Sequence, residues 1–212
     1  MIRFAVEQLA SAGLEEVMVV TGETYADDFE RELASPRSFG LREIRYGYQR
    51  RAGGIAEALG LCESFASAGP IVVLLGDNIF EYSAAPLVER FRAAPQGARI
   101  VLARVDNPAS YGIAVMDGNR LVRIVEKPAA ALGNLAVTGL YFYDSRVFEI
   151  VKTLRPSSRG ELEITDVNNR YLELGALGYE RVAGYWVDCG ESITMLTRAS
   201  ALVAERGANK PQ

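Results

Sequence analysis

The sequence contains no histidine and two cysteines among its 212 residues. Without imidazole, acid–base catalysis and metal binding must rely on carboxylate, lysine, arginine or tyrosine side chains. Cys62 and Cys189 lie too far apart in the sequence to form a CxxC motif, so neither a zinc site nor a disulfide framework is expected. This use of cysteine fits a reducing compartment.

Long hydrophobic runs and an excess of positive charge are also missing. No segment reaches the roughly 18 apolar residues of a membrane span, and the start, MIRFAVEQLASAG, lacks the long apolar core of a signal peptide. The formal net charge of −4 and the pI near 5.1 argue against nucleic acid or an anionic membrane as the main partner. We therefore expect a cytoplasmic globular protein.

The order of apolar runs and turn residues predicts an α/β fold. In the first half, helical and strand patterns alternate, which is typical of βαβ units in a mostly parallel sheet covered by helices on both faces. A hairpin is expected around Asp117, Gly118 and Asn119, where two alternating runs meet at a turn. We interpret residues 1–206 as a single domain whose sheet gains antiparallel strands late in the chain. Residues 207–212 are expected to form a frayed polar end. The predicted helices cover 2–12, 25–33, 54–67, 86–94, 145–154, 163–174 and 191–206, and the predicted strands cover 17–20, 43–49, 71–75, 99–105, 113–116, 121–126, 135–143 and 177–187.

Two aspartates follow predicted strands. Asp77 comes directly after the buried run IVVLL and Gly76, and Asp188 follows the strand-like residues 184–187. Ligands of open α/β sheets bind at the carboxyl ends of strands. If the fold brings the two carboxylates together, they can share one Mg²⁺ with substrate phosphates. Each aspartate taken alone could equally be a turn former.

Glu126 and Lys127 end the second arm of the hairpin, before Pro128. The proline restricts this strand end to extended or turn geometry. A lysine fixed there can meet a phosphate, and the glutamate can accept hydrogen bonds from a sugar diol. A solvated surface ion pair would give the same pattern.

Three further positions could bind a ligand. Arg159 could clamp a phosphate with two hydrogen bonds, or lie on the surface beside a helix start. Tyr111 and Gly112 precede the hairpin, where a glycine lets backbone amides approach a ligand, although the tyrosine could serve core packing. Gln49 ends a strand, and Gly53 and Gly54 open a helix, which is an acceptable place for a base or ribose.

Taken together, these segments resemble the sugar nucleotidyltransferases, in particular glucose-1-phosphate thymidylyltransferases. The resemblance runs from about residue 1 to residue 206. It implies a Rossmann-like nucleotide-diphosphosugar transferase fold and a reaction in which dTTP and glucose 1-phosphate give dTDP-glucose and pyrophosphate. The segments that carry it are, in order, LLGDNIF, YGIAV, EKP at 126–128, AVTGLYFYD at 136–144, RGELEITD at 159–166 and residues 186–190.

The resemblance also assigns roles to particular residues. It implies that Asp77 and Asp188 bind Mg²⁺ and form the catalytic set together with Lys127. It implies that Arg159 and Lys127 both bind the sugar phosphate. It also implies that the protein is a homo-oligomer. The other implied contacts are Tyr111, Gly112, Glu126 and Val137 along the hexose, with Gln49 and Gly54 at the thymine base.

The start of the sequence departs from the family pattern. Members of the family begin with a strand and a GGxGTRL loop that hold the triphosphate, whereas this sequence starts just after them, and Cys189 stands in place of the usual threonine. We therefore expect a domain without its first strand, with exposed sheet edges. Because each lost oxyanion-type donor typically costs roughly 10²- to 10³-fold in rate, we expect little or no turnover from this 212-residue chain. The alternative is a non-catalytic sugar-nucleotide-binding or regulatory subunit that borrows the missing strand from a partner.

Overall fold

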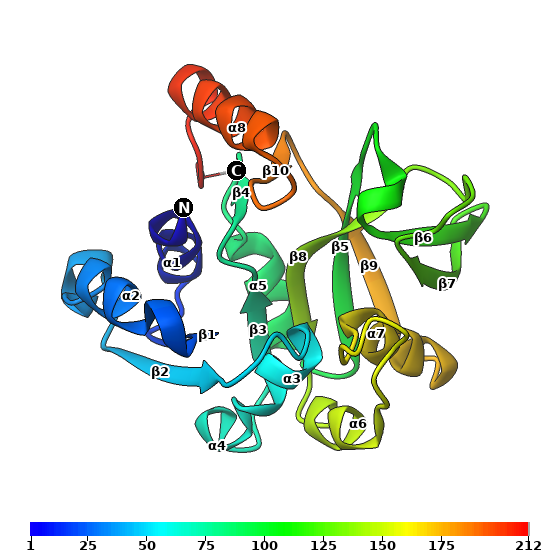
Figure 1. The fold of residues 1–212 in the computed structure, drawn as a ribbon, viewed down its shortest axis with the longest axis horizontal. Coiled ribbons are helices and arrows are strands. Elements are labelled where there is room, and N and C mark those ends of the chain that lie inside the picture. Colours follow the sequence, from blue (N-terminus) through cyan, green and yellow to red (C-terminus); the bar gives the residue numbers. More distant parts are fainter. Residues whose placement is uncertain (212) are drawn as a thin grey trace.

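A computed structural model describes residues 1–211 and shows helices arranged around a curled sheet (Figure 1). No helix in this described part is both long and apolar enough to cross a membrane. The helices are α1 (Ile2–Ser11), α2 (Ala26–Glu32), α3 (Ile55–Gly60), α4 (Glu63–Ala66), α5 (Ala85–Ala93), α6 (Val147–Thr153), α7 (Ile164–Glu173) and α8 (Ile193–Arg206). The strands are β1 (Glu16–Gly22), β2 (Glu43–Gln49), β3 (Ile71–Leu74), β4 (Asn78–Phe80), β5 (Ala98–Arg104), β6 (Gly112–Asp117), β7 (Arg120–Glu126), β8 (Leu135–Tyr143), β9 (Leu177–Arg181) and β10 (Trp186–Asp188).

The main sheet is built around β8. Its strand order is β7-β6-β8-β5-β9, and β3 also pairs with β8. A parallel pair, β1 and β2, and an antiparallel pair, β4 and β10, lie outside this sheet. Five of the seven strand pairings in residues 1–211 are antiparallel. The predicted α/β class with a mixed sheet is therefore confirmed, but the expectation of a mostly parallel sheet is wrong because β8 runs against all three of its neighbours.

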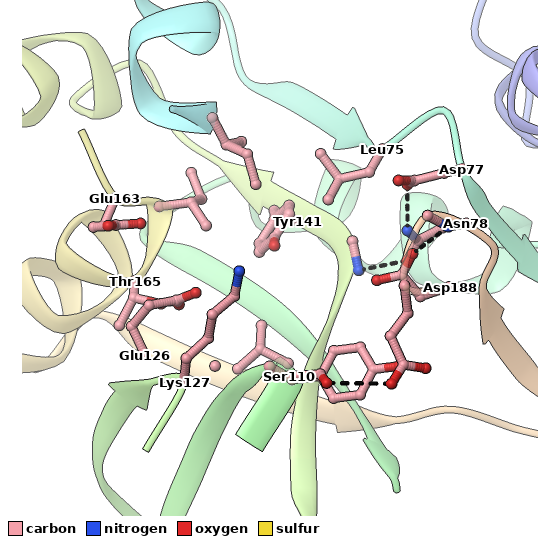
Figure 2. Close-up of a pocket in the computed structure, with 18 of the residues that line it drawn as sticks. Leu75, Asp77, Asn78, Ser110, Glu126, Lys127, Tyr141, Glu163, Thr165 and Asp188 are labelled. Carbon is pink, nitrogen blue, oxygen red and sulfur yellow. Dashed lines mark hydrogen bonds between the residues drawn. The ribbon is translucent and has the colours of Figure 1, made fainter. Parts of the chain in front are cut away.

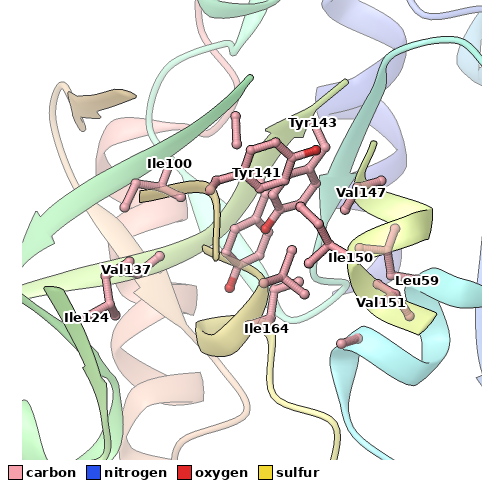
Figure 3. Packing of buried hydrophobic residues seen from close by; sticks show 14 of the residues in the cluster. Leu59, Ile100, Ile124, Val137, Tyr141, Tyr143, Val147, Ile150, Val151 and Ile164 are labelled. Atoms are coloured by element: carbon pink, nitrogen blue, oxygen red, sulfur yellow. The ribbon is translucent and has the colours of Figure 1, made fainter. Parts of the chain in front are cut away.

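Both faces of the sheet are covered by packed side chains. Successive side chains of a strand point to opposite sides, so β8 contributes to a core on each face. On one face, Tyr141 and Tyr143 of β8 pack with helices α3, α6 and α7 in the largest cluster of buried residues (Figure 3). On the other face, Leu140 and Phe142 pack with Val101 of β5 and with α5. The long apolar run of β8 is thus a strand buried on both sides, as its sequence predicts.

Strands β1 and β3 each have a single pairing partner within residues 1–211. β1 pairs with β2, and β3 pairs with β8. Val72 and Leu74 of β3 nevertheless pack against the cluster that contains Val17 and Val19 of β1. The side chains of the two strands therefore share a core while their backbones form no ladder with each other. Each of the two strands therefore has one edge without a strand partner in residues 1–211, and the exposure of these edges stays a prediction.

The C-terminal residues are not frayed over the part that the structure describes. Asn209 donates from its backbone N–H to Phe80 O at 3.0 Å, and Ser83 N–H donates to Lys210 O at 2.7 Å. Lys210 Nζ and Arg206 Nη2 also reach the carboxylate of Glu81, at 2.9 and 2.6 Å, and the Glu81 side chain is 2% exposed. The prediction for residues 207–211 is therefore wrong, because a buried carboxylate holds this polar segment in place. Residue 212 lies outside the described residues.

Two other boundaries differ from the sequence prediction. The helix expected over 54–67 is divided into α3 and α4, and the strand material over 177–187 is divided into β9 and β10, which belong to different sheets. The predicted hairpin is confirmed as β6 and β7, with Gly118 in the turn at a φ of 59°. That left-handed conformation is one that glycine adopts without steric cost.

Candidate active site

A cavity of about 570 Å³ opens beside β8 and the carboxyl end of β3. Acidic side chains outnumber basic ones in its wall, by six carboxylates to one lysine and one arginine. A polyanion alone would be repelled by this wall, so a phosphate ligand needs a cation to accompany it. The lining residues are Ile55, Leu75, Asp77, Asn78, Ala109, Ser110, Tyr111, Gly112, Glu126, Lys127, Val137, Gly139, Tyr141, Arg159, Glu161, Glu163, Ile164, Thr165, Asn168, Trp186, Asp188, Gly190 and Glu191.

The two strand-end aspartates come together at one end of this cavity (Figure 2). The antiparallel pairing of β4 with β10 sets Asp188 opposite Asn78, the residue next to Asp77. A methyl carbon built on Gly190 would lie 2.3 Å from Asp77 Oδ2 and 3.3 Å from Asp188 Oδ1. Both oxygens therefore border one small space, which glycine leaves free. The predicted convergence of the two carboxylates is confirmed, although they are more than a hundred positions apart in sequence.

Asn78 holds this end of the cavity rigid. Its Nδ2 donates to Asp77 Oδ1 at 2.8 Å, and its Oδ1 accepts from Gly139 N–H at 2.9 Å and from Trp186 Nε1 at 2.6 Å. The Asn78 side chain is 2% exposed. Buried polar groups with satisfied hydrogen bonds rigidify their surroundings. Asn78 is thus a positioning residue for the Asp77 carboxylate.

The electrostatics of the pair suit a divalent cation. Burial raises the pKa of the Asp188 carboxyl, and the nearby charge of Asp77 raises it further. A cation between the two groups would relieve that repulsion, and hard cations such as Mg²⁺ take one or two carboxylates and complete their coordination with phosphates and water. In residues 1–211 there is no group of three or more Asp, Glu, Cys or His side chains placed to hold a metal. The donor set therefore fits an ion that shares its coordination with a substrate.

Lys127 supplies the cation nearest the middle of the cavity. Figure 2 shows its ammonium group pointing inward toward Tyr141. The backbone of Lys127 has a φ of 40°, and its N–H donates to Tyr111 O at 3.0 Å. Left-handed conformations cost a residue with a Cβ about 1–2 kcal/mol, and such strain clusters at functional sites. The chain thus accepts a strained residue at the position that aims an ammonium group into the cavity.

Arg159 lies in the cavity wall but is already paired with carboxylates. Its Nη2 is 2.8 Å from Glu163 Oε2 and its Nε donates to Glu163 Oε1 at 3.1 Å. Glu161 and Glu126 also lie within 3.6 Å of Arg159 Nη2. Burial acts to raise the pKa of Glu163, but its hydrogen bonds with Arg159 and Ser157 hold that pKa below its usual value. Arg159 can therefore offer only its remaining donors to a ligand.

The end of the cavity opposite the aspartates carries Glu126 and Thr165, and Tyr141 lies between the two ends (Figure 2). Thr165 Oγ1 donates to Glu126 Oε2 at 2.5 Å. Burial raises the pKa of the Tyr141 hydroxyl, and nearby carboxylates, Glu126 first among them, raise it further. Tyr141 therefore stays protonated and can donate a hydrogen bond. Together, these three residues offer neutral donors and a carboxylate acceptor, the groups that bind the hydroxyls of a sugar.

Eight of the ten predicted site residues line the cavity. Gln49 and Gly54 do not: Gln49 Nε2 donates to Gly54 O at 3.1 Å, beside Ile55, which does line the wall. Their assignment to a base stays a prediction. The eight residues that the structure brings together are Asp77, Tyr111, Gly112, Glu126, Lys127, Val137, Arg159 and Asp188.

Several lining residues were not predicted. Asn78 and Thr165 sit inside the segments GDNIF and RGELEITD, and Tyr141 sits inside the apolar run of β8. Glu191 accepts hydrogen bonds from Tyr111 Oη and Ser110 Oγ, both at 3.2 Å. Proximity to Asp77 could have identified Asn78. Nothing in the pattern of a buried strand marks which tyrosine faces a cavity.

Replacing Lys127 by glycine is expected to give a more stable protein than replacing it by alanine, by about 1 kcal/mol. Both variants remove the ammonium group, but only alanine retains the Cβ that strains a residue at this φ. Chemical denaturation would measure the two free energies of unfolding. An alanine variant at least as stable as the glycine variant would show that the backbone of Lys127 carries no strain.

The chain is similar in sequence to a known family and to several curated proteins. Residues 1–205 match the family model described as Nucleotidyl transferase. A glucose-1-phosphate thymidylyltransferase from Actinoplanes sp. is 40% identical over 90% of this chain and 63% of its own length. The nucleotidyltransferase Agl11 of low-salt glycan biosynthesis in Haloferax volcanii is 37% identical over 96% of this chain and 57% of its own length. The chain thus spans less than two thirds of these two relatives.

Two solved structures superpose on this chain over most of its length. A protein from Bacillus anthracis assigned as a glucose-1-phosphate thymidylyltransferase, in complex with sucrose, superposes with a TM-score of 0.88. The match has 43% identity and covers 95% of this chain and 81% of that one. A UDP-glucose pyrophosphorylase in complex with UDP-glucose superposes with a TM-score of 0.81 at 23% identity, over 96% of this chain and 86% of that one, which is a likeness of fold.

Proposed function

Because the chain belongs to the nucleotidyl transferase family, we propose that its cavity binds dTTP and glucose 1-phosphate with Mg²⁺ and serves the synthesis of dTDP-glucose. The observation that carries the proposal is the meeting of Asp77 and Asp188 around the space left by Gly190. The relatives named as glucose-1-phosphate thymidylyltransferases support the choice of nucleotide and sugar.

In the proposed reaction, a phosphate oxygen of glucose 1-phosphate attacks the α-phosphorus of dTTP. The bond from that phosphorus to the oxygen bridging the α- and β-phosphates breaks, and pyrophosphate leaves. The attacking phosphate oxygen is already anionic, so no residue has to accept a proton, and the absence of histidine from the sequence is no obstacle. A bound Mg²⁺ supplies charge neutralisation for the phosphates.

The residues of the chain would position the two substrates. Asp77 and Asp188 would hold the cation, with Asn78 fixing the Asp77 carboxylate. Lys127 would bind the sugar phosphate as a point charge, and Arg159 would contribute the donors that Glu163 leaves free. The hexose would lie toward the opposite end, beside Gly112, Glu126 and Val137, with the Tyr111 side chain bordering it from the side of Asp188 and Glu191. Gln49 and Gly54 would face the thymine base from the neighbouring wall.

Calorimetry with dTDP-glucose tests this function. We expect the chain to bind dTDP-glucose with Mg²⁺ present, and to bind it much more weakly when EDTA replaces the metal. UDP-glucose serves as the matched ligand, because it differs in the pyrimidine methyl group and in the 2′-hydroxyl of the ribose. The proposal would be contradicted if the chain bound neither dTDP-glucose nor UDP-glucose.

Pyrophosphate release from dTTP and glucose 1-phosphate is measured beside binding. For the 212-residue polypeptide we expect a rate near the detection limit, because its sequence contains no GGxGTRL loop to hold the triphosphate. Robust release would overturn that expectation and would support the transferase reaction directly.

A further inference from the structure

Glu191 joins two separate segments of the cavity wall. It is half-buried and lies in the turn between β10 and α8. Its Oε1 accepts hydrogen bonds from Asn107 Nδ2 and Ser110 Oγ, both at 3.2 Å, and its Oε2 accepts one from Tyr111 Oη at 3.2 Å. The three donors belong to the segment 107–111, which leads into β6 and lies at least 80 positions earlier in the sequence. One carboxylate therefore ties together two segments that are distant in the chain.

The Glu191 carboxylate is the main polar anchor of this segment. Within residues 1–211, every hydrogen bond from residues 107–110 to a distant part of the chain ends on Glu191. The other hydrogen bonds of residues 107–110 stay within the segment 107–111. The segment is also held by the ring of Tyr111, which packs edge-on against Trp186 with 5.4 Å between ring centroids. Because a charged acceptor strengthens hydrogen bonds, we expect the loss of Glu191 to loosen the segment.

Tyr111 connects Glu191 to Lys127. The carbonyl oxygen of Tyr111 accepts a hydrogen bond from the backbone N–H of Lys127 at 3.0 Å, and the Tyr111 hydroxyl donates to Glu191. Burial raises the pKa of the Tyr111 hydroxyl, and the charges of Glu191 and Asp188 raise it further, so the hydroxyl stays protonated and remains a donor. A displacement of Tyr111 would therefore move the strained backbone from which the Lys127 ammonium group extends into the cavity (Figure 2).

The turn that carries Glu191 also holds the Asp188 carboxylate. Gly190 N–H donates to Asp188 Oδ1 at 2.9 Å, so the aspartate is fixed within the same short segment. Hydrogen bonds then run from this turn through Glu191 and Tyr111 to Lys127. A ligand with two linked phosphates has to be met at both ends of this path. Groups that are already correctly spaced bind such a ligand at a lower entropic cost.

We propose that Glu191 is a positioning residue that sets the spacing between the Asp188 carboxylate and the Lys127 ammonium group. This inference rests on the proposed function, because it takes the ligand to be a nucleotide sugar with one phosphate near each of the two groups. Glu191 acts through Tyr111 and does not itself contact the phosphates. Its contribution to binding should therefore disappear once residue 127 has lost its charge.

The test is a double-variant cycle on Glu191 and Lys127, measured by calorimetry with dTDP-glucose and Mg²⁺. Glu191→Ala and Lys127→Met are each expected to weaken binding about tenfold. The double variant should bind within about twofold of Lys127→Met alone, because an ammonium group that is absent cannot be misplaced. Methionine is chosen because it keeps a long side chain with a Cβ at the φ of 40° and removes the charge.

Two further variants separate positioning from charge and from general effects on the fold. Glu191→Gln keeps an oxygen that can accept from Tyr111 Oη, so we expect it to bind dTDP-glucose within about threefold of the wild type. Glu205→Ala removes a carboxylate from an exposed site on α8 outside the cavity wall, and it should leave the affinity unchanged. Melting temperatures measured on the same samples should show that every variant is folded.

Three results would overturn the role of Glu191. Additive losses from Glu191→Ala and Lys127→Met would show that Glu191 acts independently of Lys127. A loss in Glu191→Gln as large as that in Glu191→Ala would show that the charge matters and the hydrogen bond to Tyr111 does not. The third is an unchanged affinity in Glu191→Ala. If the wild-type chain did not bind dTDP-glucose with Mg²⁺ present, the proposed function itself would be contradicted.

Discussion

Replacing Asp77 by asparagine is expected to weaken Mg²⁺-dependent binding of dTDP-glucose by roughly 100-fold. Asparagine has the size of aspartate and still offers an oxygen to Asn78 Nδ2, so the local hydrogen bond survives. What disappears is one of the two charges that face the space beside Gly190. With one carboxylate left, the cation loses a ligand, and the phosphates that it carries lose their counter-charge.

Calorimetry with Mg²⁺ and with EDTA measures this effect. Asp117→Asn is the control, because Asp117 lies in the exposed hairpin turn, pairs with Arg120 and does not line the cavity. Asp188→Asn should behave as Asp77→Asn does. If Asp77→Asn bound dTDP-glucose as tightly as the wild type, or if EDTA left the wild-type affinity unchanged, these aspartates would not hold a metal.

Replacing Gly190 by alanine is expected to weaken the same binding by about tenfold or more while leaving both carboxylates in place. The added methyl carbon would lie 2.3 Å from Asp77 Oδ2, so the Asp77 carboxylate would have to turn away from the space that it shares with Asp188. The backbone of Gly190 is not among the positive-φ glycines, so alanine meets no conformational penalty there. The change acts through shape and keeps the charge of the site.

Gly22→Ala is the matched control for this variant. It adds the same methyl group at a glycine that also lacks a positive φ, and the added carbon would meet nothing within 4 Å. Gly22→Ala should bind Mg²⁺ and dTDP-glucose as the wild type does, with a melting temperature no lower than that of the wild type. Wild-type affinity in Gly190→Ala would mean that the ligand does not use the space between the two aspartates.

The aspartate pair could be predicted from the sequence because its geometry follows from local rules. The apolar run at 71–75, followed by Gly76, places the Asp77 carboxylate at the edge of a sheet, and Asp188 likewise follows a short strand-like segment, although without the glycine. The relative direction of neighbouring strands was harder to predict from the sequence. The return of β8 between β3 and β5 is a long-range pairing, and alternating strand and helix patterns do not show which neighbour a strand chooses.

Other parts of the site depend on tertiary contacts that the sequence does not reveal. Tyr141 and Tyr143 lie two residues apart on one face of β8, yet Tyr141 lines the cavity and Tyr143 does not. Asn168 looks like any polar residue of an amphipathic helix until its burial is seen. The C-terminal residues were misjudged for a similar reason, because the carboxylate that anchors them, Glu81, lies far away in sequence.

Strands β1 and β3 bury their side chains but leave one row of peptide groups without a strand partner within residues 1–211. Amide protons on those rows have no strand acceptor within residues 1–211, so they should exchange with deuterium far faster than those of β5, which is paired on both sides by β8 and β9. Isotope labelling followed by mass spectrometry would show fast exchange for part of the amides in residues 16–22 and 71–74, because the amides that face β2 or β8 stay paired. The same rows can accept a strand from another copy of the chain, so labelling at rising protein concentration should slow this exchange as copies associate.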